Sequence, residues 1–310
     1  MLQTIQQLLQ LAQNNNLPRL DAELIIAHVL KKPREFVLAN PETKIKRLKD
    51  LKIKKLFKQC QQNKPLAYIT GHKEFFGLDF KVNKNVLIPR PDTELMVELV
   101  FEKIKRLKDY KIILVDVGTG TGCIPITILK TNPTLPSPHR GGNSSPYKGE
   151  VGGGFATYAI DISAKALTVA KANAKKHGVK IKFIKGDLLS PTPPLLKGGR
   201  GDIGQQKFQI IITANLPYLT PSQFKSEPSI KHEPKLALVA GKDGLKYYRQ
   251  LMKQIKKLSS EFKVRSSIFL EIDPSQAKSI KLLIKHHFPH AKITIHQDLS
   301  GKDRVVEVEI

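Results

Sequence analysis

The chain of 310 residues lacks the long apolar runs of membrane proteins. No stretch approaches the ~18 consecutive apolar residues of a transmembrane helix, so we expect no membrane partner. The first residues, MLQTIQQLLQLAQNNN, contain no basic start followed by an apolar block, which a secretory signal would require. Cys60 and Cys123 are too few and too far apart for a disulfide framework or a zinc site. We therefore expect a cytoplasmic protein without a bound metal.

Acidic and aromatic residues are also scarce. Only 27 Asp and Glu side chains oppose 52 Lys and Arg, which gives a net charge of +25, and aromatics make up 6% of the chain. A nucleic-acid partner is one explanation of this excess, and proximity to the ribosome would suit it too. The basic residues are scattered, however, with few aromatics between them. A genomic preference for lysine codons is therefore the simpler explanation.

Residues 1–74 are predicted to form a small helical domain. TIQQLLQLAQ and LDAELIIAHVL carry apolar residues at helical spacing, and prolines punctuate the pattern. In the next segment, KIKRLKDLKIKKLFKQC, we expect a helix whose apolar face consists of Ile45, Leu48, Leu51 and Leu56, with lysines in solvent opposite.

The rest of the chain alternates between strand and helix patterns. Residues 75–89 predict a connecting hairpin around an Asn-Lys-Asn turn. Residues 90–310 predict a doubly wound, mostly parallel sheet, with strands KIILVDV, TYAID, KIKFIKG, FQIIIT and SSIFLEI and a helix that stops at Gly178. The last segment, AKITIHQDLSGKDRVVEVEI, holds two strands joined by a short link, which predicts an antiparallel pair.

Two stretches depart from this alternation. Residues 133–154 and 191–206 are rich in Pro, Gly, Ser and Lys, each with a proline-rich start and a basic Gly-Gly tail. Such segments cannot bury a core, so we predict flexible surface inserts. Contact with RNA is one role for them. A repetitive element tolerated in a surface connection is the simpler interpretation, because long loops cost little stability.

A glycine-rich turn follows the first strand of the α/β region. LVDVGTGTGCI places Gly118, Thr119, Gly120, Thr121 and Gly122 where a ligand can approach the backbone closely and meet a helix N-terminus. The third glycine comes one residue too early for the dinucleotide pattern Gly-x-Gly-x-x-Gly, and no Gly-Lys-Ser/Thr ending marks a P-loop. The turn favours a nucleoside ligand such as S-adenosylmethionine.

An acid that binds ribose is expected about 20 residues after such a turn, at the end of the next strand. Asp161 lies 43 residues after Gly118, and removing the 22 residues 133–154 shortens this separation to 21. The spacing thus supports both interpretations together, Asp161 as a ligand residue and 133–154 as an insert. The competing role for Asp161 is an N-cap of the following helix.

The next two strands also end in polar residues. Asp187 could accept a hydrogen bond from an adenine amino group while Leu188 packs on the ring, although a turn aspartate is an equal alternative. The fourth strand ends in Asn215, Leu216, Pro217 and Tyr218. Because the carboxyl ends of parallel strands meet at one edge of a sheet, we expect all of these side chains to lie beside one crevice.

Taken together, these motifs resemble those of the HemK/PrmC family, the peptide chain release factor N5-glutamine methyltransferases. The resemblance covers nearly the whole chain apart from the two inserts. It is carried by GTGTG, by NLPY where the family usually has Asn-Pro-Pro-Tyr, and by YITGHKEFFGLDFKV, VLIPRPDTE, EPKLALVAGKDGLKYYRQ, FLEIDPSQ and DLSGKDRVVEV.

The resemblance implies a class I S-adenosylmethionine-dependent methyltransferase: a Rossmann-like, seven-stranded, mostly parallel sheet with an antiparallel C-terminal hairpin, and a helical N-terminal domain for substrate recognition. It implies methylation of the side-chain amide of glutamine in the Gly-Gly-Gln motif of class 1 release factors, in support of translation termination. The implied cofactor-binding residues are Gly118, Thr119, Gly120, Thr121, Gly122, Asp161, Asp187, Leu188 and Asn215. The implied catalytic residues are Asn215, Leu216, Pro217 and Tyr218.

The chemistry explains the Asn-x-Pro-Tyr motif. An amide nitrogen is a poor nucleophile, so the site must hold it in line with the methyl group and stabilise the positive charge that develops. The side-chain oxygen of Asn215 and the carbonyl of Leu216 can each accept one N–H of the substrate. Pro217 stiffens the turn, and Tyr218 can stack on the flat amide.

Leu216 departs from the family's usual proline but keeps the backbone carbonyl. Asn-Leu-Pro-Tyr also resembles ribosomal RNA adenine dimethyltransferases, which lack the PRPDTE motif and the helical domain. The alternative function is therefore an RNA or DNA adenine N6-methyltransferase, and a third is a non-catalytic adenosyl-binding module. We expect a monomer whose partner is a release factor.

Deleting residues 133–154 and rejoining the ends with a short turn should leave the affinity for S-adenosylmethionine within a few-fold, because the deletion restores the 21-residue spacing between Gly118 and Asp161. Calorimetric titration of both forms measures this. A folded deletion variant that no longer binds the donor would show that the segment belongs to the binding site.

Overall fold

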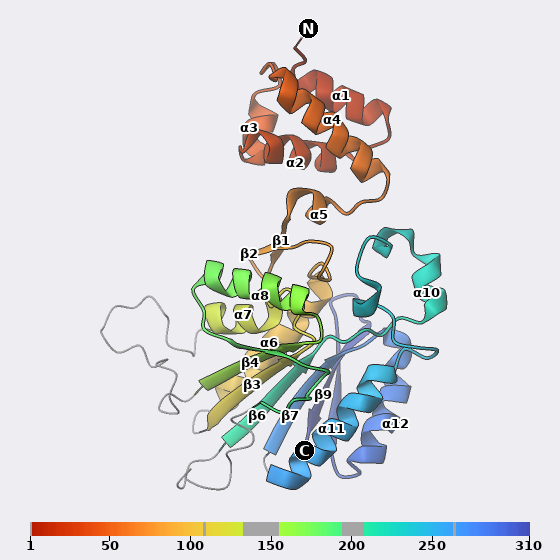
Figure 1. The fold of residues 1–310 in the computed structure, drawn as a ribbon. Helices are drawn as coiled ribbons and strands as arrows, with labels where there is room; N and C mark the ends of the chain where they lie inside the picture. The colour runs from red at the N-terminus through yellow and green to blue at the C-terminus, as the bar shows by residue number, and fades with distance from the viewer. Residues whose placement is uncertain (1, 108–109, 133–154, 194–207, 263–264) are drawn as a thin grey trace, which may run out of the picture.

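The computed structural model describes residues 2–107, 110–132, 155–193, 208–262 and 265–310. The predicted insert 133–154 lies outside the described residues, as does all of the second insert beyond 193. A bundle of helices at the N-terminal end stands apart from a larger α/β layer structure that holds the rest of the chain (Figure 1).

The N-terminal helices pack around an apolar core of their own. They are α1 (Ile5–Asn14), α2 (Arg19–Leu30), α3 (Arg34–Ala39), α4 (Arg47–Gln61) and α5 (Leu66–Thr70). A capping box at Thr4 begins α1, and the fully buried Leu8 and Ile25 lie in the core that the helices share. The predicted helical segments are thus confirmed.

The predicted apolar face of α4 is wrong for Leu48 and Leu51 and confirmed for Leu56, which is partly buried against the core of the helical domain. Leu48 is 83% exposed and Leu51 54% exposed, whereas Ile53 and Phe57 are the buried residues of this helix. Ile45 is buried but precedes the helix. The spacing of four between Ile53 and Phe57 keeps both on one side of a helix with 3.6 residues per turn. That side lies on α2, and it leaves the earlier leucines in solvent.

The predicted hairpin exists but its turn lies elsewhere. β1 (His72–Phe75) pairs antiparallel with β2 (Leu78–Lys81). Phe76 and Gly77 form the turn, both with positive φ (51° and 70°), which suits the twist of a two-residue hairpin. The Asn-Lys-Asn stretch follows β2, where Asn83 Oδ1 accepts a hydrogen bond from the Asn85 N–H. A phenylalanine at positive φ gives no sequence signal of a turn, which explains the error.

The main sheet confirms the predicted fold class. Its seven strands have the order β5-β4-β3-β6-β7-β9-β8, and only the pairs that involve β9 are antiparallel. The strands are β3 (Lys111–Val117), β4 (Phe155–Asp161), β5 (Lys182–Lys185), β6 (Phe208–Ala214), β7 (Arg265–Glu271), β8 (Lys292–Gln297) and β9 (Asp303–Glu309).

Helices cover both faces of this sheet (Figure 1). The longer ones are α6 (Glu94–Arg106), α7 (Cys123–Thr131), α8 (Ala164–His177), α11 (Lys246–Phe262) and α12 (Ala277–His287). Shorter ones are η1 (Pro91–Thr93), α10 (Pro221–Ser226), η2 (Pro228–Ile230), η3 (Lys235–Ala237) and η4 (Pro274–Gln276). Gly178 ends α8 in the left-handed conformation, as predicted.

Alternate residues of β3 enter different cores. Ile113 and Val115 pack in the core that contains residues of α11 and α12, while Ile112 and Leu114 pack in the core of α6 and α7. Successive side chains of a strand point to opposite faces, so a strand covered on both sides is mostly apolar. Asp116, Thr157 and Ser267 are buried polar exceptions within the strands. No helix of the described part is long and apolar enough to cross a membrane.

The two faces of α4 give a test of the packing. Ile53→Ala should lower the free energy of unfolding by about 2–4 kcal/mol, because it leaves a cavity at a fully buried position. Leu48→Ala is the matched control and should change it by less than about 0.5 kcal/mol. Denaturant unfolding followed by circular dichroism measures both, and similar losses would show that Leu48 is packed in solution.

Candidate active site

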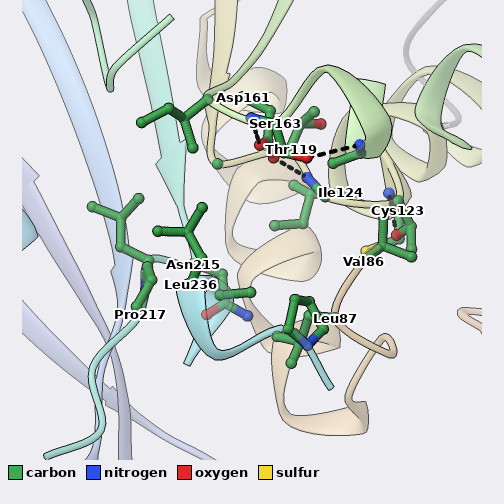
Figure 2. Close-up of a pocket in the computed structure, with 18 of the residues that line it drawn as sticks. Val86, Leu87, Thr119, Cys123, Ile124, Asp161, Ser163, Asn215, Pro217 and Leu236 are labelled. Carbon is green, nitrogen blue, oxygen red and sulfur yellow. Dashed lines mark hydrogen bonds between the residues drawn. The ribbon is translucent and has the colours of Figure 1, made fainter. Parts of the chain in front are cut away.

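A cleft opens at the carboxyl edge of the parallel strands, where β3, β4, β5 and β6 end. Most of the predicted site residues line it: Gly118, Thr119, Gly120, Thr121, Asp161, Asp187, Leu188, Asn215, Leu216 and Pro217. Figure 2 shows Asp161 and Thr119 on one side of this cleft and Asn215, Leu236 and Pro217 on another. Gly122 and Tyr218 are not among its lining residues.

The glycine turn is held in place by the neighbouring strand. The N–H groups of Gly118 and Thr119 both donate to the Ile160 carbonyl, at 2.9 and 3.0 Å. Gly118 and Gly120 have positive φ values of 76° and 54°, and a Cβ on Gly120 would meet nothing closer than 3.9 Å. The turn therefore leaves open space where a ligand can lie against the backbone.

Gly122 has a packing role. Its φ is 79°, and a Cβ there would lie 2.9 Å from Ile126 Cδ1 and 3.3 Å from Ala170 Cβ. Ala170 belongs to α8 and Ile126 to α7, so a side chain at Gly122 would push these helices apart. This packing is enough to explain why a glycine stands at position 122. The predicted contact between Gly122 and the cofactor stays a prediction.

Asp161 reaches back to the glycine turn, as the spacing predicts. Its Oδ2 accepts a hydrogen bond from the Gly120 N–H at 2.9 Å, and its Oδ1 accepts one from the Ser163 N–H at 2.8 Å (Figure 2). Burial raises the pKa of this carboxyl, and the two N–H groups oppose that effect. The N-cap of α8 is Ser163, whose hydroxyl accepts from Ala166, so the competing role for Asp161 is wrong.

Asp187 and Leu188 form a tight turn after β5. The Asp187 N–H donates to the Ser190 carbonyl at 2.8 Å, and Leu188 has a φ of 55°. Gln250 of α11 donates from Nε2 to Asp187 Oδ2 at 2.8 Å. Leu188 is 7% exposed and belongs to the core beside α11. Asp187 is thus a turn residue that also lines the cleft, and its contact with an adenine amino group stays a prediction.

The Asn-Leu-Pro-Tyr stretch touches the glycine turn. A Cβ on Gly118 would come 3.2 Å from Leu216 Cδ2, so the leucine side chain lies directly under the turn. Asn215 donates from Nδ2 to Thr93 Oγ1 at 3.1 Å. The hydroxyl of Tyr218 is directed to Glu271 Oε1 at 3.5 Å, and burial raises the pKa of this phenol.

A second pocket lies on the other side of this stretch. Asn215, Leu216 and Pro217 line both cavities, and Tyr218 lines only the second. The second pocket continues along the segment after β6, with Gln223, Ser226, Glu227, Ile230 and Leu238. These three consecutive residues, together with Leu87, Arg90 and Ala237, lie at the boundary of the two cavities, an arrangement that suits transfer between two bound molecules.

The sequence prediction missed the residues that hold the far wall of the cleft. Arg90 pairs with Glu233, whose side chain is 1% exposed, and Glu233 Oε2 also accepts from the Ile88 N–H at 3.0 Å. This link fastens the loop before α6 to the segment that carries Leu236, a half-exposed residue in the cleft. These residues belong to the motifs VLIPRPDTE and EPKLAL, but the distance between the two motifs in the sequence gives no sign that Arg90 and Glu233 pair.

Two buried acids lie behind the site. Asp116 Oδ1 accepts from the Thr213 hydroxyl at 2.7 Å, and burial raises the pKa of Asp116 to about 6. Burial likewise raises the pKa of Glu271, at the end of β7, to about 7. The described residues contain no group of three or more His, Cys, Asp or Glu side chains that could hold a metal ion.

Comparisons with known proteins agree with the sequence motifs. The PrmC N-terminal domain model matches residues 1–71, and a methyltransferase domain model matches residues 108–263. The chain is 34% identical over 301 residues to a release factor glutamine methyltransferase of Bacillus anthracis, covering 96% of this chain and 95% of that protein. It is 33% identical over 289 residues to the Bacillus subtilis protein of the same name, covering 92% and 89%.

A bifunctional methyltransferase of Rickettsia bellii is 32% identical over 324 residues, and the match covers 95% of this chain but 52% of that protein. Among solved structures, a release factor-specific protein-(glutamine-N5) methyltransferase of Alicyclobacillus acidocaldarius is 24% identical with a TM-score of 0.38, covering 74% of this chain and 98% of that one. The assignment of the chain to a family therefore rests on the proteins that match it in sequence.

Asp161→Ala should weaken S-adenosylmethionine binding about 10–100-fold, because the ribose would lose a charged acceptor and the Gly120 N–H would lose its partner. Excess donor should restore most of the turnover. Ser163→Ala is the control, since it removes the α8 cap but keeps the carboxylate. Calorimetry and initial rates measure both effects, and a turnover defect that persists at saturating donor would assign Asp161 another role.

Proposed function

The chain belongs to the release factor glutamine methyltransferases, and from this premise we propose that it methylates the side-chain amide of the glutamine in the Gly-Gly-Gln motif of a class 1 release factor. The observation that carries the proposal is the position of Asn215, Leu216 and Pro217 between two pockets. One pocket is bounded by the glycine turn and would take the methyl donor. The other would take the glutamine side chain.

The first pocket fits S-adenosylmethionine. It combines an acid at the glycine turn, Asp161, with the apolar side chains of Ile162, Leu188 and Leu236, and the bare backbone of Gly120 leaves room beside them. Asp161 would accept from the ribose hydroxyls, and Asp187 from the adenine amino group. When bound, the donor supplies an electrophilic methyl group on a sulfonium.

The acceptor nitrogen needs two hydrogen-bond acceptors at fixed positions. Asn215 Oδ1 would accept one N–H and the Leu216 carbonyl the other, which aims the nitrogen lone pair at the methyl group. As the N–C bond forms, the bond from the methyl carbon to the donor sulfur would break and release the neutral thioether. The nitrogen carries positive charge until one of its protons passes to water. Both oxygens stabilise that charge without having to reorient, because the surrounding structure already fixes them.

The helical domain, residues 1–74, would bind the release factor, and residues 90–310 would transfer the methyl group. Residues 75–89 would connect these two domains. His232, in the segment beside the second pocket, lies 3.1 Å from the Gln62 carbonyl at the end of α4. This contact links the helical bundle to the acceptor side of the site.

We further propose that the enzyme works as a monomer in the cytoplasm, where release factors act at the ribosome. Its net charge of +25 suits that environment.

Adenine N6-methylation of RNA or DNA is the alternative function, because an exocyclic amine presents similar chemistry. The full-length relatives favour the protein substrate, since their match includes the N-terminal helical domain. Incubating the enzyme with labelled donor and either release factor or RNA separates the two functions. A single ~14 Da gain on the Gly-Gly-Gln peptide is the expected result, and label in RNA alone would overturn the proposal.

Asn215→Ala should lower the rate of methyl transfer to release factor about 10²–10³-fold, because it removes one preorganised acceptor at the reacting nitrogen. The fold should survive, since the side chain faces a cleft. Single-turnover transfer measures the rate, with thermal unfolding and donor titration as controls. Near-normal transfer by a folded variant would show that Asn-Leu-Pro-Tyr has no catalytic role and only forms the turn at the end of the strand.

A further inference from the structure

Asn215 is useful as an acceptor only in one of its two amide orientations. A rotation of 180° about the last side-chain bond exchanges Oδ1 and Nδ2, and the NH₂ group cannot accept a hydrogen bond from the substrate. The orientation must therefore be fixed by a neighbour that distinguishes the oxygen from the nitrogen. The structure places one such neighbour beside Asn215, Thr93, whose Oγ1 accepts from Asn215 Nδ2 at 3.1 Å.

Thr93 comes from a distant part of the chain and lies at the wall of the first pocket. It is the last residue of η1 and precedes α6 in the cap position, yet its side chain makes no capping hydrogen bond to that helix. The residue is 2% exposed. Burying a hydroxyl is costly unless it is hydrogen-bonded, so its contact with Asn215 offsets that cost.

Glu271 explains why the threonine oxygen accepts. Thr93 has one hydroxyl proton, and the buried Glu271 has a carboxylate oxygen, Oε2, without a hydrogen-bond partner among the described residues. The hydroxyl of Thr93 is close enough to lower the pKa of Glu271, against the larger effect of burial. When Glu271 is ionised it can only accept, so the threonine proton is directed to it. The lone pairs of Thr93 Oγ1 then remain for Asn215, and only the NH₂ end of the amide satisfies them.

We propose that Thr93 is a positioning residue which, with Glu271 behind it, fixes the Asn215 amide so that Oδ1 faces the acceptor nitrogen. The proposal rests on the proposed function and adds the means by which its key acceptor is oriented. Thr93 does not itself need to touch the substrate. It acts by holding the one side chain whose orientation decides whether the glutamine nitrogen is aligned.

The test compares Thr93→Val, which keeps the shape and removes the hydroxyl, with Thr93→Ser, which keeps the hydroxyl. At pH 8.5, kcat on release factor should fall about 10–100-fold in the valine variant and stay within about 3-fold in the serine variant. The KM for S-adenosylmethionine should change little in either. Equal kcat values for wild type and a folded valine variant would overturn the proposal.

A second measurement does not depend on activity. The side-chain NH₂ protons of Asn215, identified by their absence in Asn215→Ala, should exchange with water faster in Thr93→Val than in wild type or Thr93→Ser. Unchanged exchange in the valine variant would overturn the proposal as well. Should that variant fail to fold, Thr93→Ala gives the same comparison. A wild-type enzyme that transfers no methyl group to release factor would instead overturn the proposed function, while exchange still tests the orientation.

Discussion

The register of β3 between its two parallel neighbours is the constraint on which the site depends. Val117 pairs with Ile160 on β4 and with Ala214 on β6, so these three residues form one row across the sheet. The next residue along each strand begins the site: Gly118 of the glycine turn, Asp161 and Asn215. A shift of one strand by a single residue would reverse its side chains and separate these groups. The apolar strands that fix this register thereby place the polar residues.

The same logic shows why much of the site could be predicted from the sequence. The glycine turn, Asp161 and Asn215 each follow a mostly apolar strand, and Asp187 follows the edge strand β5. Parallel strands expose their carboxyl ends at one edge, which brings these residues together. The separation of Asp161 from the glycine turn matches the expected spacing only when residues 133–154 are counted as an insert, and the hydrogen bond from the Gly120 N–H to Asp161 brings the two groups together.

The remaining groups could not be predicted because their contacts depend on tertiary packing alone. Thr93 meets Asn215 across 122 positions and Arg90 meets Glu233 across 143, with no periodic pattern to relate them. The prediction of the buried face of α4 was partly wrong for a similar reason. Leucines at a spacing of three resemble a buried stripe, but the position of α2 decides which side is covered, and it covers Ile53 and Phe57.

Leu216 shows how the site accommodates a departure from the family's usual proline. Its side chain is 3% exposed and packs beneath Gly118, so it joins the acceptor motif to the donor turn by apolar contact. Unlike proline, it also has a backbone N–H. Leu216 and Tyr248 pack in one apolar core, burial raises the pKa of the Tyr248 phenol, and the Tyr248 hydroxyl donates to the Glu271 carbonyl. Packing of the leucine side chain against the glycine turn and the core can therefore hold this stretch where a proline ring would otherwise stiffen it, and the backbone of Leu216 stays at the boundary of the two pockets.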